Sequence, residues 1–147
     1  MRIKISIPGA PVPKGRPRFS FRSKKPIAYT PQKTRSAEDI IKTIATATAY
    51  TQKWKLSFKP LIVVVNSFRA MPVYLQASNR LKRANNRYTL RPVSRPDADN
   101  LGKLVLDALN GIIYRDDSQI VSMIFNKYYS ETPRTEIMVQ EVPENDK

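Results

Sequence analysis

The stretch Leu-Gly-Lys-Leu-Val-Leu-Asp-Ala-Leu-Asn-Gly, residues 101–111, carries the strongest structural signal in the chain. Its apolar residues recur at the i, i+3, i+4, i+7, i+8 spacing of an amphipathic helix: Leu101, Leu104, Val105, Ala108 and Leu109. Asn110-Gly111 follows directly and is a typical helix stop. The pattern predicts a helix with one face in the core and the other in solvent.

Strand patterns lie on both sides of this helix. Ile3, Ile5 and Ile7 alternate with polar residues, and residues 60–70 are rich in β-branched side chains. Residues 120–129 and 135–142 predict two more strands, joined by a turn around Pro133. Residues 90–96 are expected to be extended, and residues 76–87 to form a short helix or a loop.

A second helix is predicted from Thr30-Pro31, which resembles an N-cap followed by proline at the first helical position. We expect it to run to about Trp54, with one apolar face made of Ala37, Ile40, Ile41, Ile44 and Ala47. The order strand, helix, strand, helix, strand, strand predicts a single two-layer α+β domain over residues 1–147, with a flexible tail from about residue 143.

The charge is strongly one-sided. The chain has 26 Lys and Arg against 12 Asp and Glu, a formal net charge of +14. Such an excess is typical of proteins that bind phosphate backbones. General solubility and RNA packing of the ribosomal type are the alternatives. The segment 9–25 combines several prolines with basic residues, which excludes a helix and favours an extended basic loop.

The residue types that are missing exclude whole classes of mechanism. With no histidine and no cysteine, the chain has no Ser-His-Asp or Cys-His nucleophile, no thiolate or histidine zinc site and no disulfide. Catalysis must then use carboxylates, lysine, arginine, hydroxyls or a metal held by oxygen. Without a secretory signal or a long apolar run, a cytoplasmic protein that does not enter a membrane is expected.

Five of the twelve acidic residues of this basic chain lie within 21 residues: Asp97, Asp99, Asp107, Asp116 and Asp117. Asp97 and Asp99 are two residues apart, so in an extended segment their carboxylates project to the same side. Mg²⁺ prefers such oxygen ligands together with water and substrate phosphate. A lysine close by, such as Lys103, would stabilise a phosphodiester transition state.

Each of these residues also has an ordinary structural interpretation. One aspartate before a helix serves as an N-cap. Lys103 and Asp107 have the i,i+4 spacing of a surface salt bridge, and Asp116-Asp117 fits a polar turn. From the residues alone, a metal-dependent nuclease and a non-catalytic DNA-binding protein remain equally open.

Four segments together resemble the RusA family of Holliday-junction resolvases. These are Arg-Pro-Asp-Ala-Asp-Asn-Leu-Gly-Lys (95–103), Leu-Asp-Ala-Leu-Asn-Gly (106–111), Asp-Asp-Ser-Gln-Ile (116–120) and, as in phage and prophage members, Gly-Ala-Pro-Val-Pro-Lys-Gly-Arg-Pro-Arg-Phe (9–19). The resemblance implies a mixed β-sheet with two main helices, a homodimer, and a Mg²⁺-dependent endonuclease that makes paired nicks in four-way junctions. Mn²⁺ would substitute for Mg²⁺, and no small-molecule cofactor is expected.

The resemblance also implies roles for single residues. Asp97, Asp99 and Asp117 would bind the metal, Lys103 would be the catalytic lysine, and Asp107 and Asp116 would support them. Between the lysine and the aspartate pair the chain is about one residue shorter than the family pattern, so either Asp116 or Asp117 is the ligand; Asp117 is preferred.

DNA contacts are expected from basic residues on both sides of the first predicted helix and before the second: Lys14, Arg16, Arg18, Arg22, Lys24, Lys25, Lys82, Arg83 and Arg95. Phe19 and Phe21 would either stack on unpaired bases at the branch point or belong to the core. A nuclease for flaps or other branches, and a branched-DNA or RNA-binding protein without catalysis, are the remaining alternatives.

Overall fold

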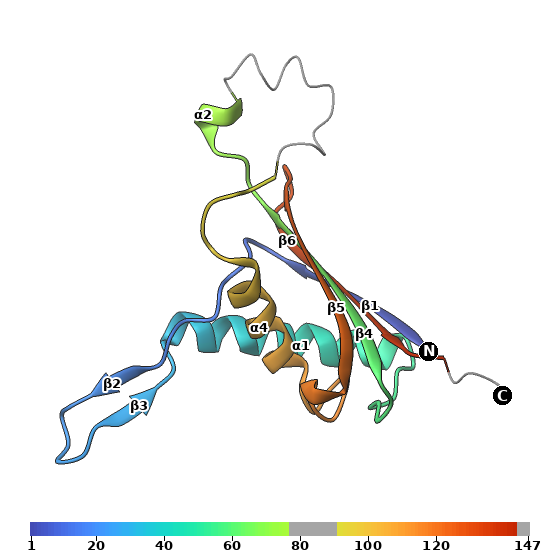
Figure 1. Cartoon of the computed structure of the whole chain (residues 1–147), viewed down its shortest axis with the longest axis horizontal. Helices are drawn as coiled ribbons and strands as arrows, with labels where there is room; N and C mark the ends of the chain where they lie inside the picture. Colours follow the sequence, from blue (N-terminus) through green and yellow to red (C-terminus); the bar gives the residue numbers. More distant parts are fainter. Residues whose placement is uncertain (77–90, 144–147) are drawn as a thin grey trace.

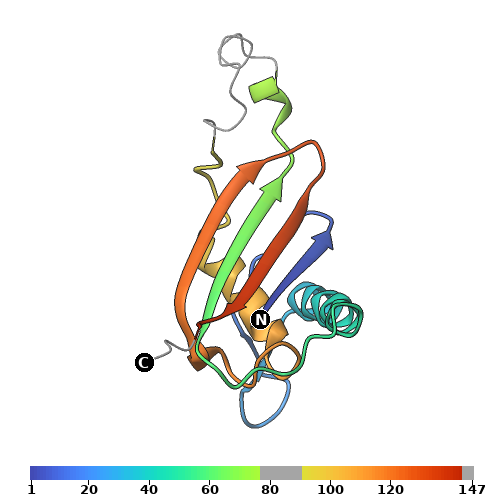
Figure 2. The ribbon, with the colours of Figure 1, turned by 90° about the vertical axis from the view of Figure 1, so that its right-hand side faces the viewer.

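The computed structural model describes residues 1–76 and 91–143. In chain order the elements are β1 (Arg2–Pro8), β2 (Arg18–Ser20), β3 (Ile27–Tyr29), α1 (Gln32–Thr51), β4 (Leu61–Arg69), α2 (Val73–Gln76), α4 (Ala98–Leu109), the 3₁₀ helix η1 (Asp117–Gln119), β5 (Ile120–Tyr129) and β6 (Arg134–Glu141). The helices α1 and α4 lie on the same side of a four-stranded sheet (Figure 1), and Figure 2 looks onto the opposite face of that sheet. The predicted α+β architecture, a mixed sheet with two main helices, is confirmed.

The sheet has the strand order β1-β6-β4-β5. β6 is antiparallel to both of its neighbours, β1 and β4, whereas β5 is parallel to β4. A parallel pair needs a crossover connection, and α4 lies in it. One row of side chains crosses the sheet in register: Ile5 lies opposite Ile137, Ile137 opposite Val65, and Val65 opposite Phe125.

The core lies between this sheet and the two helices. Alternate residues of β1 and β4 are buried, among them Ile3, Ile5, Val63 and Val65. The whole predicted apolar face of α4 is buried as well, from Leu101 to Leu109. After α4, Gly111 has φ +75°, the left-handed conformation that ends a helix at low cost for glycine.

Gly102 sets how closely α4 approaches the sheet. A Cβ atom at this position would lie 2.8 Å from the terminal methyl of Met123 and 3.2 Å from the Phe125 ring. Both of these side chains belong to β5, so α4 rests directly on that strand at Gly102.

The structure corrects the predictions for α1 at both ends of the helix and on its buried face. The helix begins at Gln32 and ends at Thr51, with Pro31 as the N-cap residue and no side-chain cap. Its buried face includes Ala45 and Ala49, whereas the predicted core residue Ile40 is 53% exposed. The small alanines lie on the buried face because α1 packs closely on β1 and α4. Trp54 lies beyond the helix end, where its indole N–H donates to the carbonyl of Ile113 at 2.9 Å.

The segment predicted to be an extended basic loop contains a hairpin of β2 and β3, with Phe19 opposite Ala28. Its prolines do not prevent pairing because Pro11, Pro13 and Pro17 precede β2 and Pro26 lies between the two strands. The hairpin extends away from the sheet and helices (Figure 1). Phe19 and Phe21 are 61% and 79% exposed, so neither belongs to the core.

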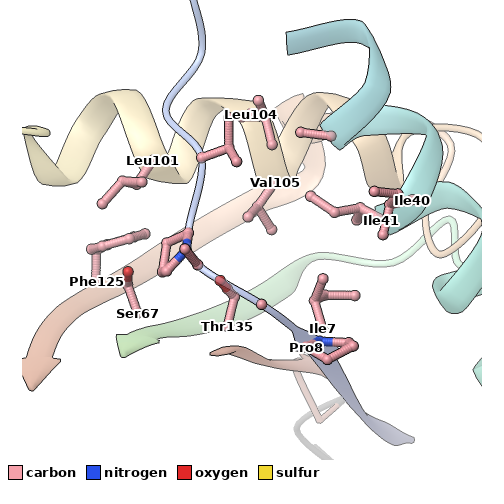
Figure 3. A pocket seen from close by; sticks show the side chains of 15 residues that line it. Ile7, Pro8, Ile40, Ile41, Ser67, Leu101, Leu104, Val105, Phe125 and Thr135 are labelled. Carbon is pink, nitrogen blue, oxygen red and sulfur yellow. The ribbon is translucent and has the colours of Figure 1, made fainter. Parts of the chain in front are cut away.

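A small apolar cavity of about 70 Å³ lies between the helices, the sheet and the chain that leaves β1. Figure 3 shows Leu101, Leu104 and Val105 of α4 on one side of it, with Phe125 and Thr135 of the sheet opposite. Because its lining is almost entirely hydrocarbon, the cavity is a packing gap in the core. In the described ranges, no helix is both long and apolar enough to cross a membrane.

Candidate active site

Asp97 and Asp99 lie at the N-terminal end of α4. Asp97 is the last residue before the helix, with φ −70° and ψ 150°, and Asp99 lies in the first turn. Asp97 makes no side-chain capping hydrogen bond, which argues against the N-cap interpretation of this residue. Both residues are exposed, and neither carboxylate has a hydrogen-bond or ion-pair partner among the residues that the structure describes. The pair is therefore available to a ligand, next to the positive end of the helix dipole.

Two cations from the sheet hold the segment that leads into Asp97. Arg69, at the end of β4, donates from Nη1 to the carbonyl of Arg95 at 2.8 Å and to Ser94 Oγ at 3.2 Å. Lys127 of β5 donates from Nζ to the carbonyl of Ser94 at 2.9 Å. The sequence analysis missed both residues. The available signal was a basic residue late in each of two strands that are otherwise largely apolar.

Lys103 follows Asp99 by one helical turn and is exposed. The predicted i,i+4 salt bridge between Lys103 and Asp107 is not formed, because Asp107 binds Lys14 instead. Lys103 has no ion pair with any described residue. Its ammonium group is therefore available on the same stripe of α4 as Asp99.

Lys14 has a different position from the one expected for a DNA contact. Its ammonium group is hydrogen bonded to Asp107 of α4 and lies 3.5 Å from Glu38 of α1. Partial burial disfavours the charge, but the hydrogen bond and the negative charge of Asp107, followed by those of Glu38, raise the pKa of Lys14 above its ordinary value. The backbone N–H of Lys14 also donates to the carbonyl of Asn100. These contacts attach the basic segment to both helices.

Asp116 and Asp117 differ in their contacts. Asp116 is the N-cap of η1: its Oδ1 accepts from the Ser118 N–H at 2.9 Å, and its own N–H donates to Gln119 Oε1. Hydrogen bonding from Ser118 holds the pKa of Asp116 below its ordinary value. The Asp117 carboxylate is half-buried and has no hydrogen bond to a described residue. This contrast favours Asp117 over Asp116 as the ligand.

Asp117 also contributes to the electrostatics at the C-terminal end of α4. Burial, followed by the negative charges of Asp117 and Asp107, raises the pKa of Tyr114 far above its ordinary value. The neutral Tyr114 hydroxyl donates to the carbonyl of Leu106 at 3.0 Å. Asp117 therefore lies close enough to Tyr114 for its charge to act on that hydroxyl.

Within one subunit the predicted ligands do not form a single group. The pair Asp97 and Asp99 is at one end of α4, and Asp117 follows its other end; at about 1.5 Å per residue, the 12 residues of α4 span roughly 18 Å. Across the described ranges, no three acidic side chains come together in a way that could hold a metal ion. The assignment of all three residues to one metal remains a prediction. It requires that the third carboxylate come from outside the subunit that supplies Asp97 and Asp99.

The other predicted DNA contacts lie in three places. Arg16, Arg18, Arg22, Lys24 and Lys25 are exposed on the β2–β3 hairpin or just before it. Arg95 is exposed beside Asp97. Lys82 and Arg83 lie outside the described residues. The structure thus has exposed cations on the hairpin and next to Asp97 and Asp99.

Most of the chain matches known proteins. Residues 8–140 match the family described as Endodeoxyribonuclease RusA, a range that includes the hairpin and every predicted ligand. The uncharacterized protein YqaN of Bacillus subtilis (strain 168) is 37% identical over 140 residues, which cover 95% of this chain and 96% of YqaN. The chain therefore belongs to the RusA family of endodeoxyribonucleases.

Proposed function

We propose that this protein is a Mg²⁺-dependent endonuclease that resolves four-way DNA junctions by paired, symmetric nicks. The main support is the exposed pair Asp97 and Asp99, which has no partner among the described residues at the helix end where anions are already favoured. Acids that have no partner within residues 1–76 and 91–143, in a chain of net charge +14, are better explained by a bound cation than by solubility.

The donor set fits Mg²⁺. This ion binds proteins through one or two carboxylates and completes its octahedral shell with water and substrate phosphate. Asp97 and Asp99 would hold it; Asp117, which follows the opposite end of α4, would be the third carboxylate only if it came from a second subunit. When bound, the ion neutralises charge on the phosphodiester and makes an attacking water more acidic.

The remaining roles belong to the chain itself. Lys103 would stabilise negative charge on the phosphate oxygens, since its ammonium group is exposed one turn from Asp99. Arg69 and Lys127 would hold the segment that precedes Asp97 in place on the sheet, through their hydrogen bonds to Ser94 and Arg95.

Junction binding would use the β2–β3 hairpin. Its exposed cations suit phosphate backbones, and the exposed rings of Phe19 and Phe21 suit stacking on bases at the branch point, where pairing is interrupted. Two nicks in a two-fold symmetric junction require two active sites, which a symmetric homodimer supplies.

The test compares cleavage of a four-way junction, a flap and a linear duplex in the presence of Mg²⁺. We expect paired nicks at symmetric positions of the junction, little cutting of the duplex, and loss of cutting in Asp97→Asn. Asp39→Asn is the matched control, because Asp39 is an exposed acid on α1. Full activity of Asp97→Asn would refute the metal site. A preference for the flap would favour the branch nuclease, and junction binding without cutting would favour the non-catalytic protein.

A further inference from the structure

A row of stacked side chains crosses the outer face of the sheet, the face that α1 and α4 do not cover (Figure 2). Phe68 of β4 lies in register with Tyr128 of β5 and Arg134 of β6, and it follows the buried Ser67, so its ring is on the face away from the core. The rings of Phe68 and Tyr128 are stacked, with 5.0 Å between their centroids and 16° between their planes. The Arg134 guanidinium lies 3.9 Å from the Phe68 centroid, a favourable contact of a cation with an aromatic face.

The other end of the row is Arg91, which does not belong to the sheet. Its guanidinium lies 3.8 Å from the centroid of the Tyr128 ring, and its Nη1 donates to the carbonyl of Lys127 at 3.1 Å. The next residue, Pro92, is buried. Arg91 thus fastens to β5 the start of the segment that leads to Asp97.

The same segment is held from the helix side of the sheet a few residues later. Lys127 lies in register with the buried Ser67, and Arg69 follows Ser67 by two residues, so both side chains project toward the helix layer. They donate to the carbonyls of Ser94 and Arg95 at 2.9 and 2.8 Å. The segment is therefore attached to the outer face through its first residue and to the helix face just before α4.

Residues 91–96 form no helix or strand, so contacts of this kind determine where the segment lies. Pro92 and Pro96 fix φ at two positions, which limits the conformations that the anchors have to select. Val93 is 98% exposed and adds no packing. The position of Asp97, which follows Pro96, thus depends on the anchors at the two faces of the sheet.

We propose that Arg91 is a positioning residue for the acidic pair: stacked on Tyr128, it clamps segment 91–96 against β5 and holds Asp97 in place relative to Asp99. A row that served only the stability of the sheet would be complete with residues of β4, β5 and β6. Its fourth member comes instead from the segment that precedes Asp97. The clamp rests on these contacts alone, and its effect on metal binding rests in addition on the proposed function.

The two carboxylates differ in their need for such support. Asp99 lies within α4, which rests on β5, whereas Asp97 precedes the helix. A cation held between them requires both carboxylates in place at once, so a mobile Asp97 would have to be ordered when the ion binds, at a cost in entropy. Loss of a partner that orients a metal ligand typically lowers metal affinity by roughly 10- to 100-fold.

The clamp is tested with a nitroxide spin label on Val93→Cys, because the chain has no cysteine of its own and this side chain is exposed. In metal-free protein, Arg91→Ala and Tyr128→Ala should each sharpen the spectrum as the segment becomes mobile, whereas Tyr128→Phe keeps the ring and should keep the line shape. Arg134→Met is the matched control, since it removes the same type of contact at the other end of the row. A spectrum that Arg91→Ala leaves unchanged, or that Arg134→Met changes as much, overturns the clamp.

The effect on the acidic pair is measured by calorimetry of Mn²⁺ binding to the protein without DNA. Arg91→Ala and Tyr128→Ala should each bind Mn²⁺ about tenfold more weakly than wild type. The double variant should bind no more weakly than either single one, because both act through one contact. Arg91 is exposed, so its variant is expected to fold even if Tyr128→Ala does not. Unchanged affinity in Arg91→Ala, or additive losses in the double variant, contradict the positioning role. A wild-type protein that binds no Mn²⁺ refutes the proposed function instead, and the spin label still decides the clamp.

Cleavage separates positioning from direct contact with DNA. Loss of the exposed Arg91 charge also weakens attraction to phosphates, whereas Tyr128→Ala changes no charge. At saturating protein and low Mn²⁺, both variants should cut a four-way junction about tenfold more slowly than wild type, and both should approach wild type as the Mn²⁺ concentration rises. Recovery on adding protein rather than Mn²⁺ would place the defect in junction affinity and overturn the positioning role.

Discussion

The acidic residues at the two ends of α4 differ in what their carboxylates contact. At the N-terminal end, Asp97 and Asp99 have no partner among the described residues. At the other end, Asp107 binds Lys14 and Asp116 caps η1. The first pair does nothing for the fold that another polar residue could not do, whereas Asp107 joins segments 93 residues apart and Asp116 holds a local turn through Ser118. The comparison separates carboxylates that serve a ligand from carboxylates that serve the structure.

The largest effect is expected when one of the two carboxylates at the N-terminal end of α4 is neutralised. Asp99→Asn should slow junction cleavage by roughly a thousandfold, since it removes a metal ligand from the reacting centre. Junction binding in EDTA should stay equal or become tighter, because the variant no longer carries a negative charge near the phosphates. Single-turnover cleavage and fluorescence anisotropy measure the two quantities.

Asp116→Asn is the matched control for this substitution. Its carboxylate already accepts a hydrogen bond from Ser118, so we expect cleavage within about threefold of wild type. If Asp116→Asn reduced cleavage as much as Asp99→Asn, contacts within the protein would not distinguish ligands from structural acids.

Lys103 allows the corresponding test on an exposed cation of the same helix. Lys103→Met should reduce cleavage about a hundredfold through the loss of charge stabilisation in the transition state, with little change in junction affinity. The melting temperature should not change, because the side chain is exposed and has no ion pair with a described residue. A lower melting temperature with the same loss of cleavage would indicate a structural role.

The sequence predicted those parts of the site that depend on local structure. Leu101 to Leu109 define α4 by their spacing, and this helix places Asp97, Asp99 and Lys103 at or near one end. The contacts of Lys14 with Asp107 and of Arg69 with Ser94 join residues 93 and 25 positions apart, and no periodic pattern predicts them. The separation of Asp117 from Asp97 also depends on the path of the chain after α4. Short-range patterns thus identify the acids, and only packing determines which of them come together.

A smaller effect is expected on the salt dependence of DNA binding. The double variant Arg18→Ala, Arg22→Ala removes two exposed hairpin cations and should reduce the slope of log affinity against log salt by about 1 for each phosphate that the hairpin no longer neutralises. Cleavage at saturating protein should be nearly unchanged. Lys14→Met should leave the slope as it is, because this ammonium group is paired with Asp107 and Glu38. Equal slopes for wild type and the double variant would exclude the hairpin from the junction interface.

The smallest effect concerns the stability that the ion pair of Lys14 with Asp107 provides. Lys14→Met should lower the free energy of unfolding at pH 7 by about 1 to 3 kcal/mol, because it removes a hydrogen-bonded charge and leaves Asp107 and Glu38 facing each other. Urea unfolding measures the difference, and Lys42→Met, at an exposed position of α1, should cost much less.

The pH dependence of this difference in unfolding free energy tests whether the charge of Lys14 causes it. The pKa of Lys14 is raised above 10.5 in the folded protein, so its contribution is complete below pH 10.5 and disappears as the pH rises through the folded-state pKa. Wild type and Lys14→Met should therefore converge in stability above that pH, while Lys42→Met keeps a constant small difference from wild type. If the stability difference between wild type and Lys14→Met stayed constant through the alkaline range, Lys14 would stabilise the fold through packing of its methylene groups. The ion pair with Asp107 would then not be the source of the stabilisation.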